Sequence, residues 1–160
     1  MSALRTLSPA GPGIAGPQVG FCSHCGTAPK VELDIAPRVC GDCGMGLLLR
    51  TPAAVAPAAG EPFVVVEATL TVGAVSRGAE QFLAVDEADA INRPLDELLV
   101  AAEAEDSGPT LATAIMWAAR GDAAAREVFV RPANTFGVRC RARIGPCGPP
   151  SAAVLVLTDT

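Results

Sequence analysis

The chain has 160 residues, 50% of them hydrophobic, and a formal net charge of −5. This length accommodates one ordinary domain of about 100 residues with a small accessory module, and the 14 acidic against 8 basic side chains in residues 61–160 argue against a broad surface for nucleic acid or anionic membranes. Because the sequence has no apolar run of about 18 residues and no basic-then-apolar leader, we expect a cytoplasmic protein with no membrane partner.

Four segments follow one another along the chain. Residues 1–20 contain four glycines and three prolines without hydrophobic periodicity, so we expect a flexible tail, because such a segment buries too little apolar surface to offset its ordering entropy. Residues 21–50 hold two cysteine pairs, and residues 51–61 have the Ala/Pro composition of a semi-rigid linker. Residues 62–160 have the pattern of regular helices and strands.

The two cysteine pairs have the spacing of a zinc ribbon. Cys22 and Cys25 form one Cys-x2-Cys pair, Cys40 and Cys43 form the other, and a glycine follows each pair. Glycine lets the backbone curl so that both thiolates of a pair face one cation, and two such turns, called knuckles below, complete a tetrahedral Zn–S4 shell. The alternating residues 30–35 fit a strand of this ribbon. Since four thiolates leave no coordination position for water, we expect a structural zinc ion without a catalytic role.

Other interpretations of the cysteines stay open at this point. The same residues are able to form disulfides, to perform thiol redox chemistry, or to hold iron or an iron–sulfur cluster. Redox chemistry is disfavoured because neither pair follows a strand in a βαβ unit. His24 lies inside the first knuckle, but four well-spaced cysteines favour a place for it outside the ligand set.

The remaining sequence alternates between strand and helix signals. Two β-branched runs, at 63–68 and 70–76, predict a strand pair. Ser76 is a suitable N-cap for a short helix, Asp86 for a second, and Pro94 suits the start of a third; a longer helix follows the residues 107–110 and ends at Gly121. Strands are predicted at residues 126–131, 135–144 and 152–158. In the middle one, Phe136, Val138, Cys140, Ala142 and Ile144 alternate with the solvent-facing Arg139, Arg141 and Arg143.

This order of elements resembles a PAS domain over residues 62–158. The resemblance is carried by PFVVVE at 62–67, VSRGAEQFL at 75–83 and INRPLDELL at 91–99. Asn92 stands where the family most often has glycine, and asparagine tolerates the same left-handed backbone. The resemblance implies an α+β fold in which a five-stranded antiparallel sheet, with helices on one face, encloses a small cavity for a ligand, a cofactor or a partner. It also implies self-association as a homodimer.

The side chains expected around that cavity are apolar. Residues 62–160 contain no histidine to ligate haem and lack the reactive-cysteine motif of flavin photoreceptors, so neither cofactor is expected. Apolar residues at these periods also fill any packed core. The candidates for the ligand pocket are Phe82, Leu98, Ile115, Phe129, Phe136, Cys140 and Leu155.

These features predict a non-catalytic sensory or regulatory protein. A PAS-like domain binds a small ligand or a protein partner, and the zinc ribbon mediates docking. Two alternatives stay open: an interaction adaptor with a filled core, and a transcription-regulatory factor that contacts nucleic acid through the ribbon. No enzyme is expected, because a nucleophilic triad lacks a histidine outside the ribbon and the acidic run at 103–106 lacks an apolar wall that would raise a pKa.

Overall fold

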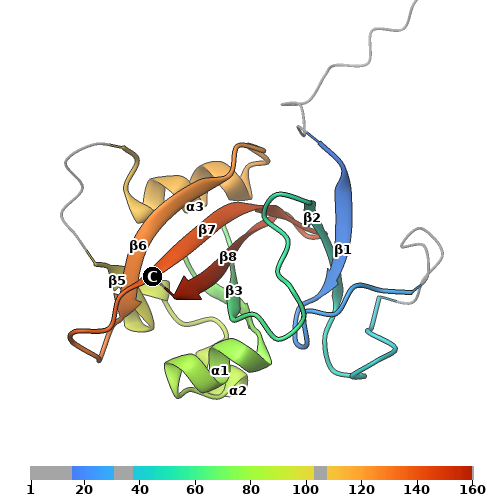
Figure 1. Ribbon diagram of the computed structural model, residues 1–160, viewed down its shortest axis with the longest axis horizontal. Coiled ribbons are helices and arrows are strands. Elements are labelled where there is room, and N and C mark those ends of the chain that lie inside the picture. Colours follow the sequence, from blue (N-terminus) through green and yellow to red (C-terminus); the bar gives the residue numbers. More distant parts are fainter. Residues whose placement is uncertain (1–15, 31–37, 103–107, 160) are drawn as a thin grey trace, which may run out of the picture.

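The computed structural model describes residues 16–30, 38–102 and 108–159. Within these ranges the fold is α+β, as expected (Figure 1). The elements in chain order are β1 (Gln18–Cys22), β2 (Leu48–Pro52), β3 (Phe63–Val66), β4 (Val72–Val75), α1 (Arg77–Leu83), α2 (Glu87–Ala90), the 3-10 helix η1 (Leu95–Glu97), β5 (Leu99–Ala101), α3 (Leu111–Ala119), β6 (Arg126–Pro132), β7 (Cys140–Cys147) and β8 (Ala152–Asp159).

The strands form one antiparallel hairpin and one larger antiparallel sheet. The hairpin joins β1 to β2, and the sheet has six strands in the order β4-β3-β8-β7-β6-β5. The expectation of five strands is therefore wrong by one. The additional strand is β5, which pairs with β6 from Leu99 opposite Pro132 to Ala101 opposite Val130. Because η1 ends after a single turn, the residues behind it extend along the free edge of β6.

The cap predicted at Ser76 is confirmed, whereas Asp86 makes no side-chain hydrogen bond at the start of α2. The Ser76 hydroxyl accepts a hydrogen bond from the Ala79 amide at 3.1 Å at the start of α1, and the Thr110 hydroxyl accepts one from the Thr113 amide at 3.1 Å at the start of α3. Each bond satisfies an amide that has no partner within its helix. Asn92 has a φ of 65°, the left-handed conformation that the sequence predicts there.

Strand β7 differs from its predicted bounds at both ends. The prediction began at residue 135, but β7 begins at Cys140, because Thr135 closes a turn onto Pro132 and Gly137 has a φ of 84°. The strand then continues through Cys147, which pairs with Ala152. The predicted alternation is confirmed within β7, where Cys140, Ala142 and Ile144 are buried and Arg141 is exposed.

The sheet is covered on both faces at β3 and β8. On one face the helices enclose the larger core, to which Val64, Val66 and Leu155 contribute. On the other face the β1–β2 hairpin packs on the sheet, and the rings of Phe21 and Phe63 meet edge to face at 5.4 Å. This double coverage explains why the first six residues of β8 are all buried, as in strands with two packed faces.

Part of the expected tail and linker belongs to this second core. The expected tail reaches into β1, which begins at Gln18, and residues 1–15 lie outside the described ranges. In the expected linker, Val55 is 0% exposed and packs so closely on β7 that a Cβ at Gly145 would lie 3.1 Å from the Val55 Cβ. The sequence from 51 to 61 therefore runs along the sheet in contact with it.

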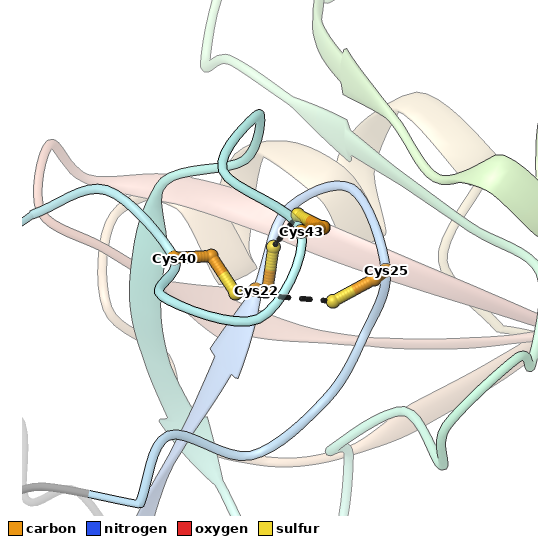
Figure 2. Close-up of side chains that lie close together, drawn as sticks. All are labelled: Cys22, Cys25, Cys40 and Cys43. Carbon is orange, nitrogen blue, oxygen red and sulfur yellow. Dashed lines mark hydrogen bonds between the residues drawn. The ribbon is translucent and has the colours of Figure 1, made fainter.

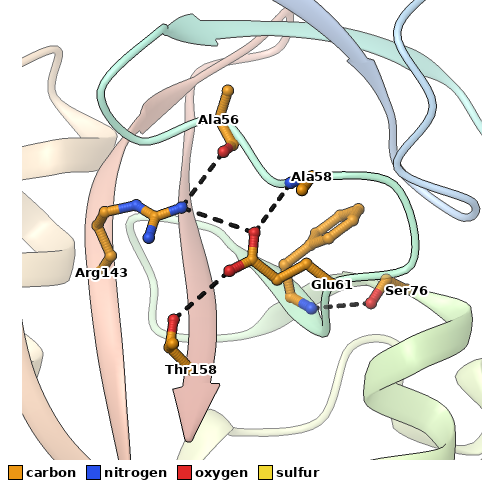
Figure 3. Close-up of polar contacts among 7 residues, drawn as sticks. Ala56, Ala58, Glu61, Ser76, Arg143 and Thr158 are labelled. Atoms are coloured by element: carbon orange, nitrogen blue, oxygen red, sulfur yellow. Dashed lines mark hydrogen bonds and ion pairs between the residues drawn. The ribbon is translucent and has the colours of Figure 1, made fainter.

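A polar cluster holds the end of this segment (Figure 3). Glu61 accepts a hydrogen bond from the Ala58 amide at 2.9 Å and lies 3.7 Å from a guanidinium nitrogen of Arg143. The other carboxylate oxygen of Glu61 accepts from the Thr158 hydroxyl at 3.5 Å, and Arg143 donates to the carbonyl of Ala56 at 3.3 Å. Glu61 thus connects residues 56–61 to both β7 and β8.

Two further sequence predictions fall on residues that are not described. The strand predicted over residues 30–35 lies, except for Lys30, outside the described ranges, and so does the acidic run at 103–106. In the described part of the chain, no helix is long and apolar enough to cross a membrane.

Candidate metal centre

Two turns of matching geometry carry the four paired cysteines. In the first, the Gly26 amide donates to the carbonyl of Cys22 at 3.0 Å; in the second, the Gly44 amide donates to the carbonyl of Cys40 at 2.9 Å. The two glycines have φ values of 74° and 68°, which side chains other than glycine adopt at a cost. The glycine after each pair therefore has the role that the sequence predicts: it closes the knuckle.

The knuckles bring four sulfur atoms together (Figure 2). Cys22 Sγ lies 3.6 Å from Cys43 Sγ, Cys25 Sγ lies 3.9 Å from Cys40 Sγ, and all four atoms lie within 4.8 Å of one another. A tetrahedron with Zn–S bonds of about 2.3 Å has edges of about 3.8 Å, whereas a disulfide bond measures about 2.05 Å. The four cysteines are free, and their spacing fits a metal ion such as zinc.

The surroundings of the sulfurs favour negative charge on some of them and oppose it on others. Burial raises the pKa of Cys22 to about 12, although the backbone N–H groups of Cys25 and His24 act in the opposite direction. At Cys43 burial also acts to raise the pKa, but the N–H groups of Met45 and Gly46, together with hydrogen bonds from the thiols of Cys22 and Cys25, lower it to about 6. Four thiolates at this spacing therefore require a cation among them, and binding of that cation releases protons.

Close backbone packing fixes the distance between the knuckles. A Cβ at Gly46 would overlap Cys22 Sγ and would lie 2.8 Å from the backbone nitrogen of His24. Ser23 adds two hydrogen bonds to Leu47, the residue before β2: its amide donates to the Leu47 carbonyl at 2.8 Å, and its hydroxyl accepts from the Leu47 amide at 2.9 Å. Only glycine at position 46 permits this approach.

His24 serves the site through its backbone. Among the described residues, the group able to hold a metal comprises the four cysteines and not His24, which agrees with its predicted place outside the ligand set. The His24 amide donates to Cys22 Sγ at 3.4 Å, and its carbonyl accepts from the amide of Arg77 at 2.8 Å. The first knuckle is therefore bonded directly to the first turn of α1.

Further bonds attach the hairpin to the opposite end of the sheet. Arg50 and Gly148 exchange backbone hydrogen bonds of 2.7 and 3.1 Å, and the Thr51 hydroxyl donates to the carbonyl of Pro146 at 2.9 Å. Thr51 is fully buried, so its hydroxyl needs this partner. Together with the contact between Phe21 and Phe63, these bonds make the cysteine cluster an integral part of the fold.

Most of the predicted pocket residues lie in the core on the helical side. Leu98, Ile115, Cys140 and Leu155 are buried there, and Phe82 packs against them from α1. Two cavities border this set. Ile115 lines one of about 500 Å³ between α3, η1 and β5, whereas Phe82 and Cys140 line another of about 320 Å³ at the end of β8. The candidates are thus divided between two sites.

Phe129 and Phe136 are corrections to that prediction. Phe129 alternates with the inward-facing Val130 in β6, so its ring lies on the outer face, where the guanidinium carbon of Arg139 is 3.8 Å from the ring centroid. Phe136 precedes β7 and is 85% exposed, with Arg131 at 5.0 Å from its ring. Neither ring reaches the interior. The Phe129 side chain points to the face of β6 opposite the one that carries Val130, and Phe136 lies in the loop before β7.

Comparison with known proteins adds no family to this description. No protein-family model matches the chain, and no curated protein matches it. The chemistry of the site must therefore be argued from the residues themselves.

A depression beside the second knuckle was not predicted from the sequence. It lies between that knuckle and the edge strand β4, and Met45, Leu47 and Ile91 contribute apolar side chains to it. Apolar residues in a short loop whose cysteines are candidate metal ligands were a usable signal, because such side chains have no core of their own to enter. The contribution of Ile91, far along the chain, had no signal in the sequence.

Proposed function

We propose that this chain is a non-catalytic sensory or regulatory module in which zinc holds the β1–β2 hairpin on the back of a PAS-like ligand-binding domain. The observation that carries the proposal is the apolar cavity of about 500 Å³ on the helical side of the sheet. Cavities of about 300–1,000 Å³ with mainly apolar walls and a few polar groups suit small ligands.

The order of elements supports the PAS-like assignment. From β3 to β8 the chain runs through two strands, three short helices, a longer helix and three strands, with β5 as the one addition. The helices share a core with one face of the sheet, which is the arrangement that the resemblance implies. The left-handed backbone at Asn92 occurs at the position where the family most often has glycine.

The walls of the cavity indicate the class of ligand. Leu95, Leu99, Leu111 and Ile115 provide apolar surface, and Asp96 is the one charged residue among the described lining residues. The hydroxyls of Thr69 and Thr71 lie at the same cavity, but they also bond to each other at 2.8 Å. A mainly apolar molecule with a hydrogen-bond donor for Asp96 fits this lining.

Zinc has a structural role in this proposal. Four thiolates complete its tetrahedral shell, so no position remains for a water or a substrate that the metal would activate. The bonds between His24 and Arg77 and between Arg50 and Gly148 make the metal-bound knuckles part of the support of the sheet. Loss of the metal would therefore weaken the domain itself and would not abolish a chemical step.

A second candidate, an adaptor with a filled core, is favoured by the packing of the other pocket residues. Leu98 is 6% exposed, and Leu155 and Ile115 are fully buried, so a ligand would have to enter beside them without displacing them. An adaptor would carry its partner sites on the surface alone. The two candidates differ in whether the cavity beside α3 admits a small molecule.

Native mass spectrometry of protein purified without added metal tests the proposal. We expect a mass that contains one zinc ion per chain and a small molecule that dissociates on activation. The variant Ala112→Phe adds a ring at the cavity wall and should lose the small molecule but keep the zinc. The control Ala88→Phe, at an exposed position of α2, should keep both. Wild-type protein that carries zinc but takes up no ligand from a metabolite extract would favour the adaptor.

A further inference from the structure

A groove of about 620 Å³ separates the second knuckle from the edge of the large sheet. Its floor is formed by Leu49 of β2, Val65 of β3 and Ala74 of β4. Its rim carries Met45 and Leu47 on the side of the knuckle and Ile91, at the end of α2, on the other side. The groove thus lies at the junction of the hairpin and the sheet, on the opposite side of β3 and β4 from the ligand cavity.

The apolar rim is unusually exposed. Met45 is 73% exposed, Leu47 45% and Ile91 37%. These side chains come from segments far apart in the sequence, and among the described residues they belong to a set of only seven large hydrophobic side chains with such exposure. Apolar side chains gathered around one depression and left in water indicate a surface that another molecule covers.

The charge around the groove has one sign. Glu67 and Glu87 both line it, and none of the described lining residues is a lysine, arginine or histidine. Glu87 uses one carboxylate oxygen to accept from the Val75 amide at 2.8 Å. Glu67 is exposed, and its contact with the Thr71 hydroxyl is long, at 3.5 Å. Since a carboxylate accepts up to about four hydrogen bonds, Glu67 retains most of its capacity for a cationic donor.

We propose that this groove binds a peptide segment of a partner protein in which an apolar side chain stands next to lysine or arginine. The proposal goes beyond the proposed function: it gives the ribbon the docking role that the sequence predicts and names the partner of that surface. The apolar anchor lies on the floor between Met45 and Ile91, and the cation reaches Glu67. The two carboxylates disfavour nucleic acid and acidic peptides as partners.

A partner segment fits the exposed rim better than a small molecule does. A small molecule inside the groove would leave much of Met45 and Leu47 in water, whereas a peptide that extends over the rim would cover them. Methionine is well suited to such contacts, because its flexible thioether adapts to different apolar surfaces. Removal of this apolar surface from water provides most of the favourable binding free energy, and the carboxylates favour a peptide with a positive charge.

The metal fixes one wall of the groove. Met45 and Leu47 follow Cys43 in the second knuckle, whose turn is closed by the hydrogen bonds from Gly44 to Cys40 and from Cys40 to Gly46, at 2.9 and 2.8 Å. The Leu47 amide is held by Ser23 of the first knuckle. The wall therefore has a defined position only while the two knuckles are held together.

Selection from a phage-displayed library of random 12-residue peptides on the zinc-loaded full chain tests the proposal. We expect enriched peptides in which an apolar residue neighbours lysine or arginine. The variant Met45→Ser should weaken their binding at least tenfold, a loss of about 1.4 kcal/mol. Glu67→Lys should weaken it as much and should enrich acidic peptides in a second selection. The control Val138→Ser, which removes a 39% exposed apolar side chain from the loop before β7, should bind like wild type.

Several outcomes would overturn the proposal. They are the absence of enriched peptides, enrichment of acidic peptides by wild-type protein, or equal binding by wild type, Met45→Ser and Glu67→Lys. Zinc content and Tm are measured for each variant, so that a loss of fold is not mistaken for a loss of contact. Retention of a small molecule in the cavity beside α3 is scored separately. If the groove binds no peptide but the cavity retains a small molecule, the groove proposal is wrong and the sensory function stands. If the groove binds peptides but the cavity stays empty, the groove proposal stands and the sensory function is wrong.

Discussion

The backbone N–H of Arg77, the first residue of α1, donates a hydrogen bond of 2.8 Å to the carbonyl oxygen of His24. His24 stands between Cys22 and Cys25 of the first knuckle, and α1 packs on the helical side of the sheet. A single bond therefore connects the metal centre with the helical face that we propose as the sensor.

Removal of the metal should release the β1–β2 hairpin from the sheet. Phe21 and Leu49 would then return to water, and burial of two such side chains is worth roughly 3–6 kcal/mol. We expect a fall in Tm on the order of 10 °C or more after treatment with a chelator. Hydrogen exchange should accelerate in β1 and β2 before it does in β6 and β7. Uniform acceleration over all strands would contradict a hairpin that is released as a unit.

The six cysteines should react with iodoacetamide in three steps. With zinc bound, we expect all six to resist at pH 8. The metal occupies the sulfur atoms of the four ligands. Burial raises the pKa of Cys140 to about 11 and of Cys147 to about 12, which leaves about one molecule in a thousand or fewer with a thiolate at either position. After chelation the four metal ligands react first. Cys147 follows, because it belongs to the core beneath the hairpin, and Cys140 in the helical core reacts last. Mass spectrometry of peptides gives the order, and modification of Cys140 before Cys147 would contradict it.

A side chain at position 46 should weaken the metal centre. Gly46→Ala places a methyl group against Cys22 Sγ and the backbone of His24, so the knuckles have to move apart. We expect at least a tenfold loss of zinc affinity in a competition with a chromogenic chelator. The matched control is Gly41→Ala in the same knuckle, where a Cβ has no neighbour within 4 Å. Equal affinities of the two variants would show that the approach at Gly46 is not required.

The pair formed by Glu61 and Arg143 should stabilise the fold more than an exposed pair does. The two side chains are only 22% and 26% exposed, and Arg143 Nε is buried without a hydrogen-bond partner, so neutralising Glu61 leaves a half-buried guanidinium with less compensation. Glu61→Gln should cost about 1–2 kcal/mol in urea unfolding. Glu97→Gln, in the exposed pair with Arg93, should cost about 0.5 kcal/mol or less. Equal costs would argue that the cluster in Figure 3 adds nothing beyond a surface pair.

Features that depend on a few neighbouring residues could be predicted from the sequence. The cluster of Cys22, Cys25, Cys40 and Cys43 follows from their spacing, because a knuckle is a local turn closed by its own glycine. The start of α1 follows from Ser76, since a cap bonds within three residues. The faces of β7 follow from alternation once the strand has begun.

Features that depend on distant partners could not be predicted. The strand β5 forms because the edge of β6 is free to pair with it. The residues from Leu99 to Ala101 carry no sequence pattern that predicts this pairing. The composition of residues 51–61 predicts a linker, but Val55 in this segment is buried because Gly145 in β7 leaves room for it. One available signal was not used: β8 is apolar without alternation, and a strand with that pattern has both faces covered.

The pairing of β3 with β8 affects how the protein is made. The hairpin docks on a surface that β3 and β8 create together, from Phe63 opposite Val156 to Val66 opposite Ala153. On the ribosome the cysteines emerge long before β8, so the knuckles are able to capture zinc while their docking surface does not yet exist. Closing such a distant strand pair is slow compared with forming local turns, and the metal-loaded hairpin must wait in solvent with Phe21 uncovered. Phe21 is therefore covered only after the last strand of the sheet has paired.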